Sequence, residues 1–427
     1  MIKEKEYKKR RDTLLTKLEN NSVGVLFSAK HQTRSNDTEY PFRQDSNFYY
    51  LTGFKEDNSS LIFAKIDGKT KTILFVAKKD KTQELWNGKR LGEIEAKKRF
   101  KVDEVYTSDK FESKLKEFLL QSNTLYFDFT LDYSKVKILK RYAKQLSTHK
   151  NLALHVEQMR LIKSKAEIKL IKKALSITKL AHHSAMTYNK ASRNEYELLS
   201  EIEYIFKKNG AYSDAYTSIV ACGNSANTLH YVKNNKPLIN NELILIDAGC
   251  EYEYYASDIT RTIPVNTKFT SAQKDIYNLV LECEEKIIKK IKPNIKRSTL
   301  QKKAIKILTK GMIELGVLKG DLKQVIKEEK YKKYYPHGIG HWMGLDVHDA
   351  CPYKDENSDE ISLQKGMVLT IEPAIYIDKD DKDVAKKYRG IGIRIEDDIL
   401  VTKDGYENLS KDIVKSIKDI EELSSIS

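Results

Sequence analysis

Cysteine and proline are scarce in this chain, and their distribution excludes several kinds of protein. The four cysteines are far apart and form no C-x-x-C pair, which argues against a disulfide framework and against a structural zinc site. Of the seven prolines, none falls between Pro41 and Pro237. No proline-rich linker is therefore expected to separate domains in that part of the chain.

Long uncharged apolar runs are also missing. No window of about 18 such residues exists, so the sequence contains no candidate membrane-spanning helix. The opening residues, MIKEKEYKKRRD, are too charged for the apolar core of a signal peptide. We therefore expect a soluble, cytoplasmic protein with no membrane partner.

Positive charge is in excess. The chain has 427 residues, a length that predicts two or three domains, and 40% of them are hydrophobic, enough for a packed core. Lysine and arginine number 76 against 61 acidic residues, which gives a formal charge of +15 and invites a nucleic-acid interpretation. Because the lysines are spread along the chain beside many acidic residues, the pattern favours a solvated surface. We expect no nucleic-acid partner.

Two regions of different pattern divide the chain. Residues 1–158 combine an opening helix, Glu4 to Glu19, with short β-rich runs such as VGVLFS, SLIFAKI, TILFVAK and TLYFDF. Residues 159–427 begin with a helical pattern near Arg160. They contain another helical pattern after a Thr270 to Gln273 capping box, and strand-like segments follow. The sequence predicts an α/β (α+β) fold with two domains.

Acidic residues inside apolar strands carry the strongest chemical signal, because a buried carboxylate without a partner is costly and usually implies a cation. In ELILIDAGCEYEYYASDITRT, Asp247 and Asp258 lie symmetrically about a centre between Tyr252 and Glu253. If the segment folds back there as an antiparallel hairpin, the two aspartates are cross-strand partners on one face, with Cβ atoms about 5 Å apart. The alternative is two carboxylates on a solvated sheet edge.

The connection of this hairpin lacks the Asn-Gly or Gly-Gly pair of a tight turn, which leaves open a loop longer than two residues. Strand alternation places Thr260 and Thr262 on the face of Asp258, and Ile259 and Ile263 on the opposite face.

Two further strands carry acidic residues. MVLTIEPAIYI holds Glu372 just before Pro373, which marks the end of the strand. In GIGIRIEDDILV, Arg394 and Glu396 are two positions apart and so face the same way, with Asp398 next along that face. A surface Arg–Glu pair is the simple alternative, but the isoleucines on either side indicate a buried strand.

Three of the nine histidines fall within twelve positions of YPHGIGHWMGLDVHD, as His337, His341 and His348. A lone histidine is more often a core or surface residue, but three among glycines suggest a backbone bent around a site. Neither H-E-x-x-H nor a cysteine zinc pattern is present. Four carboxylates with one histidine would suit a hard divalent ion such as manganese better than a structural zinc. That donor set is Asp247, Asp258, Glu372, Glu396 and one of these histidines.

These segments resemble the pita-bread metallopeptidase family, in its aminopeptidase P (Xaa-Pro aminopeptidase) branch. The resemblance rests on DAGCEYEYYASDITRT, HGIGHWMGLDVHD, TIEPAIYI and RGIGIRIEDD, and in the N-terminal part on YPFRQDSNFYYLTGF and ELWNGKRLG. It covers nearly the whole chain. It implies a creatinase-type N-terminal domain over residues 1–158 and a pita-bread catalytic domain over residues 159–427.

The resemblance also implies which residues hold metal. Asp247 would bind one ion, Asp258 and Glu396 would bridge two, and His341 and Glu372 would complete the second. The choice of His341 among the three histidines comes from the resemblance and not from spacing. We expect two divalent ions per subunit, with Mn²⁺ favoured.

The implied reaction is release of the first residue from peptides with proline second, by attack of a hydroxide that bridges the two metals. His230 and His348 would bind the substrate carbonyl and stabilise its oxyanion. Glu372 would carry the proton to the leaving nitrogen. An X-Pro bond has no N–H and a fixed φ, so it needs a dedicated pocket.

Four residues are expected around the substrate. His337 and Tyr376 would line the proline side, and Arg394 would brace the carboxylates. Trp86 has two interpretations: a core residue, as for most tryptophans, or, as the resemblance implies, the aromatic with which one subunit walls the site of its neighbour. The second interpretation makes the protein a homo-oligomer, a dimer or a tetramer.

Two alternatives stay open. A prolidase (Xaa-Pro dipeptidase) would share all five ligands but accept only dipeptides, and the N-terminal segments favour aminopeptidase P over it. A non-catalytic pita-bread protein that binds proteins or nucleic acids would typically lack ligands, and all five are present here.

Overall fold

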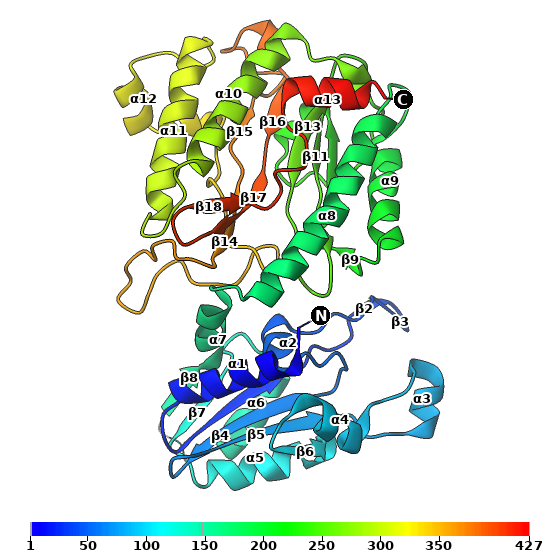
Figure 1. Ribbon diagram of the computed structural model, residues 1–427, viewed down its shortest axis with the longest axis vertical. Coiled ribbons are helices and arrows are strands. Elements are labelled where there is room, and N and C mark those ends of the chain that lie inside the picture. Colours follow the sequence, from blue (N-terminus) through cyan, green and yellow to red (C-terminus); the bar gives the residue numbers. More distant parts are fainter. Residues whose placement is uncertain (1, 145, 147, 427) are drawn as a thin grey trace. The chain divides into compact units, whose positions relative to one another are not determined.

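The structure is a computed structural model that describes residues 2–144, 146 and 148–426. The chain forms two compact units, Met1–Arg160 and Leu161–Ser427 (Figure 1). Both units combine helices with strands, which confirms the expected mixed α/β class. Among the described residues, no helix is both long enough and apolar enough to cross a membrane.

Unit 1 is built on a six-stranded sheet in the order β6-β5-β4-β1-β7-β8. Strand β4 is antiparallel to β1 and β5, and the other neighbouring strands are parallel. The sheet buries Val25, Ile62 and Phe75 together with Leu115 and Phe118 of helix α5. The elements are α1 (Glu4–Lys17), β1 (Ser22–Phe27), β2 (Thr33–Ser35), β3 (Thr38–Glu39), α2 (Ser46–Thr52), β4 (Ser60–Ile66), β5 (Lys69–Val76), α3 (Lys81–Asn87), α4 (Gly92–Phe100), β6 (Glu104–Thr107), η1 (Ser108–Lys110), α5 (Phe111–Leu119), β7 (Thr124–Phe127), α6 (Tyr133–Tyr142), β8 (Thr148–Asn151) and α7 (Leu152–Arg160).

Unit 2 packs helices around several short strands. In the view of Figure 1, α8 and α9 lie on one side of these strands, and α10 and α11 lie on the other. The helix expected after the Thr270–Gln273 capping box is confirmed as α10, with both hydrogen bonds of the box formed. The elements are α8 (Lys165–Tyr188), α9 (Glu195–Lys208), β9 (Ser213–Asp214), β10 (Ile219–Cys222), η2 (Gly223–Asn227), β11 (Leu243–Asp247), β12 (Cys250–Glu251), β13 (Thr260–Pro264), η3 (Val265–Thr267), α10 (Ser271–Ile288), α11 (Arg297–Glu314), α12 (Leu322–Lys327), η4 (Lys330–Lys333), β14 (Val368–Ile371), β15 (Ala374–Tyr376), η5 (Lys386–Tyr388), β16 (Gly392–Arg394), β17 (Asp397–Val401), β18 (Tyr406–Asn408) and α13 (Ile417–Ser424).

The strands of unit 2 form small antiparallel sheets, among them β10-β11-β13, β14-β17-β18 and β15-β16. Every residue of β11, β13, β14, β16 and β17 is buried. Apolar side chains from these strands, such as Ile246, Ile263 and Ile399, join one core with Ile276 and Leu308 of the surrounding helices. Polar residues at the ends of these strands are therefore held in place by a packed core.

The hairpin of Asp247 and Asp258 has a register that differs from the expected one by two residues. Asp247 pairs with Thr260 and not with Asp258. Strand side chains alternate with a period of two, so a shift of two keeps every side chain on its predicted face. Asp258 is consequently the diagonal neighbour of Asp247 on the same face, and the predicted sharing of that face holds.

The turn of this hairpin explains the difference in register. Tyr252 and Tyr255 form a bridge with both backbone hydrogen bonds, so the connection has only two residues, Glu253 and Tyr254. Both have positive φ, 49° and 72°, as a type I′ turn requires. A tight turn therefore forms without the glycine or asparagine on which its recognition from sequence depends.

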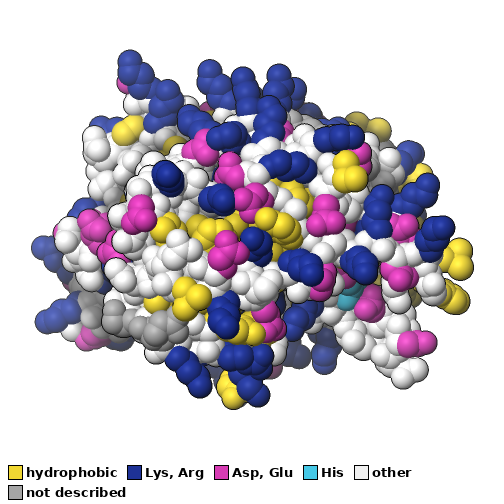
Figure 2. Space-filling model, turned by 90° about the horizontal axis from the view of Figure 1, so that it is seen from below, with side chains coloured by type: hydrophobic (Ala, Val, Ile, Leu, Met, Phe, Trp, Pro, Cys, Tyr) yellow, Lys and Arg dark blue, Asp and Glu magenta, His cyan; other side chains and the backbone are white. Residues whose placement is uncertain are grey.

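On the face drawn in Figure 2, lysine and arginine side chains are spread among aspartates and glutamates. Several lysines pair with an acid on their own helix, as Lys8 does with Asp12 and Lys286 with Glu282. Exposed pairs of this kind contribute little to stability. They do neutralise part of the excess positive charge locally.

Candidate metal centre

A cavity of about 520 Å³ in unit 2 brings together ten of the eleven predicted site residues. The eleventh, Trp86, belongs to α3 of unit 1, and 79% of its surface is exposed. The interpretation of Trp86 as a core residue is therefore wrong. The ten residues that line the cavity are His230, Asp247, Asp258, His337, His341, His348, Glu372, Tyr376, Arg394 and Glu396.

Strand ends position the four carboxylates. Asp247 is the last residue of β11, and Asp258 precedes β13 by two positions. Glu372 directly follows β14, and Glu396 lies in the step between β16 and β17. Each of these strands is buried, and each carboxylate lies at the point where a buried strand begins or ends.

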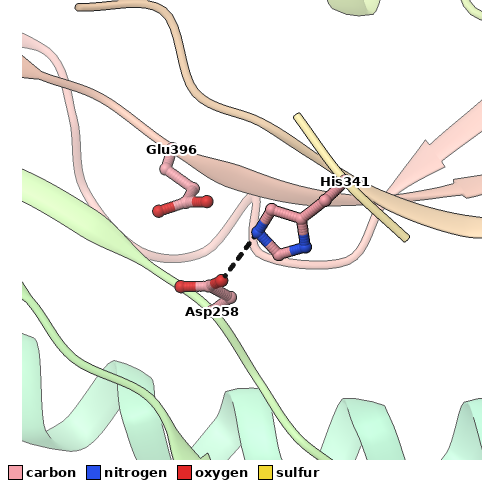
Figure 3. Close-up of side chains that lie close together, drawn as sticks. All are labelled: Asp258, His341 and Glu396. Carbon is pink, nitrogen blue, oxygen red and sulfur yellow. Dashed lines mark ion pairs between the residues drawn. The ribbon is translucent and has the colours of Figure 1, made fainter. Parts of the chain in front are cut away.

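Three side chains form the tightest group of possible ligands. Asp258, His341 and Glu396 each offer one donor atom, and these atoms lie within 4.8 Å of one another. Figure 3 shows the two carboxylates and the imidazole pointing into a common space. His341 Nε2 is 3.3 Å from Asp258 Oδ2 and 3.7 Å from Glu372 Oε1. This spacing suits three donors around a single cation, with Glu372 beside His341.

The ring of His341 is oriented by a backbone contact. Its Nδ1 lies 3.0 Å from the carbonyl oxygen of Trp342, so Nδ1 carries the hydrogen in the tautomer that satisfies this contact. In the neutral ring, the form that binds a metal ion, Nε2 then has its lone pair directed at the carboxylates. A histidine that donates one ring N–H to a carbonyl and presents the other nitrogen is the usual arrangement of a metal ligand.

Burial and mutual repulsion place the carboxylates under electrostatic strain. Burial and the charges of its neighbours Asp258 and Glu372 raise the pKa of Glu396 well above its ordinary value. Burial also raises the pKa of Glu372 to about 7, and it raises that of Asp247, against the attraction of Arg394. Burial opposes protonation of His341, yet Asp258 raises its pKa to about 9. Positive charge at this point would relieve the strain, so the donor set fits hard divalent cations.

Arg394 connects three groups of the site. Its guanidinium donates to Asp247 Oδ2, to the hydroxyl of Tyr376 at 2.7 Å and to Thr260 Oγ1 at 3.0 Å. Thr260 Oγ1 in turn donates to Glu396 Oε2 at 2.8 Å. One buried arginine therefore orients two of the four carboxylates, one directly and one through a threonine.

Tyr216 is a site residue that the sequence analysis missed. Its hydroxyl donates to Asp247 Oδ1 at 2.6 Å, and burial beside that carboxylate raises the tyrosine pKa well above its ordinary value. Both oxygens of Asp247 thus accept hydrogen bonds from protein. No local pattern marks Tyr216, which lies in the segment SDAYTSIV, 31 residues before Asp247.

The remaining histidines line the cavity around this centre. His337 Nε2 lies 3.1 Å from the hydroxyl of Tyr376, and burial lowers the His337 pKa to about 4. His348 meets the ring of His341 edge-on, with centroids 4.3 Å apart. His230 is exposed at the rim, in the loop after η2. Uncharged side chains, Thr217, Ile219, Leu229, Val232 and Val347, complete the wall.

Comparison with known proteins identifies the family. Residues 169–403 match metallopeptidase family M24, and residues 7–126 match the N-terminal domain of aminopeptidase P. A Xaa-Pro aminopeptidase of Haemophilus influenzae is 40% identical over 99% of this chain and 97% of its own.

Solved structures are similar over the same extent. Proline aminopeptidase P II from Yersinia pestis has a TM-score of 0.96 and 38% identity and covers 100% of both chains. A zinc-substituted aminopeptidase P of E. coli in complex with product has a TM-score of 0.96 and 37% identity, and the alignment covers 99% of this chain and 98% of that one. The chain belongs to metallopeptidase family M24, as a metallo-aminopeptidase with an aminopeptidase P N-terminal domain.

Proposed function

We propose that the protein is a dinuclear-metal Xaa-Pro aminopeptidase, which hydrolyses the bond between an N-terminal residue and a following proline. The observation that carries the proposal is the convergence of three buried carboxylates, the partly buried Glu372 and His341 on one cavity. It is supported by full-length similarity to a Xaa-Pro aminopeptidase. The domain limits expected from sequence, residues 1–158 and 159–427, and a cytoplasmic location belong to the same proposal.

The ligands we propose are those of the centre described above. Asp247 would hold one ion, Asp258 and Glu396 would be shared by both, and His341 with Glu372 would complete the second. The set is dominated by carboxylate oxygens, which hard ions such as Mn²⁺ prefer. Arg394, Tyr216 and Thr260 keep the oxygens turned toward the centre through the hydrogen bonds given above.

When bound, two divalent ions would lower the pKa of a water molecule toward neutrality and polarise the scissile carbonyl. The residues of the chain perform the other tasks. Glu372, which lines the cavity with Oε1 3.7 Å from His341 Nε2, accepts the proton of the attacking water and delivers it to the leaving nitrogen. His230 and His348 lie at the rim of the cavity, where an imidazole N–H can stabilise the developing oxyanion.

The proline side of the cleft is assigned to His337 and Tyr376, which lie against each other with ring centroids 5.7 Å apart. Both are neutral at pH 7, because burial lowers the pKa of His337 to about 4 and raises that of Tyr376 to about 12. Two uncharged rings offer an apolar surface to a pyrrolidine ring, which has no N–H to donate. This surface distinguishes the site from one that grips an ordinary peptide by strand pairing.

A peptide series tests this function. The purified protein with Mn²⁺ is expected to cleave a tripeptide with proline second, and to leave the matched tripeptide with alanine second almost uncleaved. Release of the first amino acid is measured by liquid chromatography. A dipeptide with proline second separates the alternative, since a protein that cleaved only the dipeptide would be a prolidase, and one that cleaved none of the three would contradict the proposal.

The exposed Trp86 supports a homo-oligomer, in which this side chain reaches the substrate site of a neighbouring subunit. Trp86→Ala is expected to raise KM for X-Pro peptides by roughly 10-fold, the equivalent of about 1.4 kcal/mol. It should change the free energy of unfolding by less than about 0.5 kcal/mol, because the side chain is on the surface.

Ile94→Ala is the matched control, since Ile94 is also in unit 1 and 73% exposed. It should leave KM unchanged. Light scattering gives the number of subunits, and a wild-type monomer, or an oligomer whose KM is insensitive to Trp86→Ala, would contradict this assignment.

A further inference from the structure

A buried ion pair lies beneath the loop that carries His341 and His348. Lys163 Nζ is 2.9 Å from Asp349 Oδ2, and each side chain is 1% exposed. The Cys351 thiol also lies against this carboxylate, with Sγ 3.2 Å from the same oxygen. Burial alone would lower the pKa of the Lys163 ammonium, but Asp349 raises it above its ordinary value. Lys163 therefore stays charged, and its ammonium fixes the Asp349 carboxylate through the buried ion pair.

The backbone of Asp349 closes the histidine loop. Its N–H donates to the carbonyl oxygen of Trp342 at 2.9 Å. The same carbonyl accepts from His341 Nδ1 at 3.0 Å. The position of Asp349 therefore sets the carbonyl that orients the His341 ring. His348 is the residue directly before Asp349, and its ring packs on His341.

Glycine at position 344 allows the loop to close on the ion pair. A Cβ at Gly344 would come within 2.6 Å of Asp349 Oδ2 and 2.8 Å of Lys163 Cε. The carbonyl of Gly344 accepts from the N–H of Ala256, two residues before Asp258. The ion pair, the histidine loop and the aspartate hairpin thus form one continuous packed unit.

We propose that the Lys163–Asp349 ion pair is a positioning element that fixes the rings of His341 and His348 for the reaction. The inference rests on the proposed function, and neither residue of the pair lines the cavity. A carboxylate that is pinned by a buried ammonium can occupy one place only, because any other position leaves a charge uncompensated in the core. The carbonyl of Trp342, which accepts from both Asp349 N–H and His341 Nδ1, passes this fixed position to the histidine ring.

Asp349→Asn in the full-length holoenzyme is expected to lower kcat by about 10- to 100-fold, the usual effect of losing a partner that orients a metal ligand. The visible absorption spectrum of the Co²⁺-loaded variant should also differ from the wild-type spectrum, because the His341 nitrogen shifts. A residue that merely stabilised the fold would lower the thermal midpoint and leave both the spectrum and the kcat of the folded protein unchanged.

The double variant Lys163→Met with Asp349→Asn separates a loss of stability from a loss of ring positioning. It removes both charges, so it is expected to regain much of the thermal midpoint lost by the single variant. It should keep the lowered kcat and the altered Co²⁺ spectrum, because a neutral pair fills the space without pinning the loop.

Glu421→Gln is the control for stability alone. Glu421 accepts from Lys274 at 3.0 Å, far along the chain from the histidine loop, and does not line the cavity. It should lower the midpoint without changing kcat or the Co²⁺ spectrum. Wild-type kcat and spectrum in the Asp349 variants, or changes no larger than those of the control, would overturn the inference. Absence of X-Pro cleavage by the wild type would instead refute the proposed function, and the Co²⁺ spectra would still decide the role of the pair.

Discussion

Asp258→Asn is expected to reduce kcat/KM for an X-Pro tripeptide by more than about 100-fold, which is the upper end of the loss for a residue that only supports a metal ligand. Asp258 Oδ2 lies 3.3 Å from His341 Nε2, nearer than Glu372 Oε1 at 3.7 Å. It is also part of the tightest donor group with Glu396. An asparagine keeps the size of the side chain and removes the charge that would bridge two cations.

The same variant should not destabilise the metal-free protein. The Asp258 charge contributes to the raised pKa of both Glu396 and Glu372, so its removal lessens repulsion among buried carboxylates. Loss of the Asp258 partner of His341, whose pKa that partner raises to about 9, acts in the opposite direction, so we expect the thermal midpoint in a chelator to stay close to that of the wild type. Asp404→Asn, at an exposed position, is the matched control and should change neither quantity. Near-normal turnover by Asp258→Asn would overturn the bridging role.

Arg394→Lys is expected to lower kcat/KM by about 100-fold even though the positive charge is retained. Arg394 contacts Asp247, Tyr376 and Thr260 at the same time through different guanidinium nitrogens. A lysine has one ammonium and cannot reach three partners in three directions. Asp247 and, through Thr260, Glu396 would lose their fixed orientation, while Tyr376 would be free to leave the proline side.

Arg389→Lys provides the comparison. Arg389 lies five residues earlier and donates to the backbone carbonyls of Val384 and Lys382. It does not line the cavity, so its replacement should leave kcat/KM within twofold of the wild type. Equal effects of the two substitutions, or an Arg394→Lys enzyme of normal activity, would show that the three-way contact has no part in catalysis.

Strand alternation carried most of the information about the carboxylates. Because alternate residues share a face, the sequence could predict that Asp247 and Asp258 lie on one side, and the structure agrees. The register could not be predicted, since it depends on positive φ at Glu253 and Tyr254, two residues that rarely adopt it. The predicted register differed from the observed one by two residues. Because this is an even number, both aspartates stayed on the predicted face.

Contacts between segments that are far apart in the chain could not be predicted from the sequence. Tyr216 reaches Asp247 from 31 residues away, and Lys163 reaches Asp349 from 186 residues away. No spacing in the sequence links Tyr216 to Asp247 or Lys163 to Asp349, so only the folded chain brings these pairs together. The choice of His341 among three histidines is a similar case. Spacing left it open, and the contact of its Nδ1 with the Trp342 carbonyl now supports it.

Metal stoichiometry tests the central claim most directly. Protein stripped with a chelator would be titrated with Mn²⁺, and both the bound metal per chain and the cleavage of an X-Pro tripeptide would be measured at each step. The account predicts that stripped protein is inactive, that two ions bind per chain, and that activity returns with them, whereas Asp258→Asn fails to recover. Full activity in the chelated wild type, or no Mn²⁺ bound above the level of the Asp258→Asn variant, would contradict it.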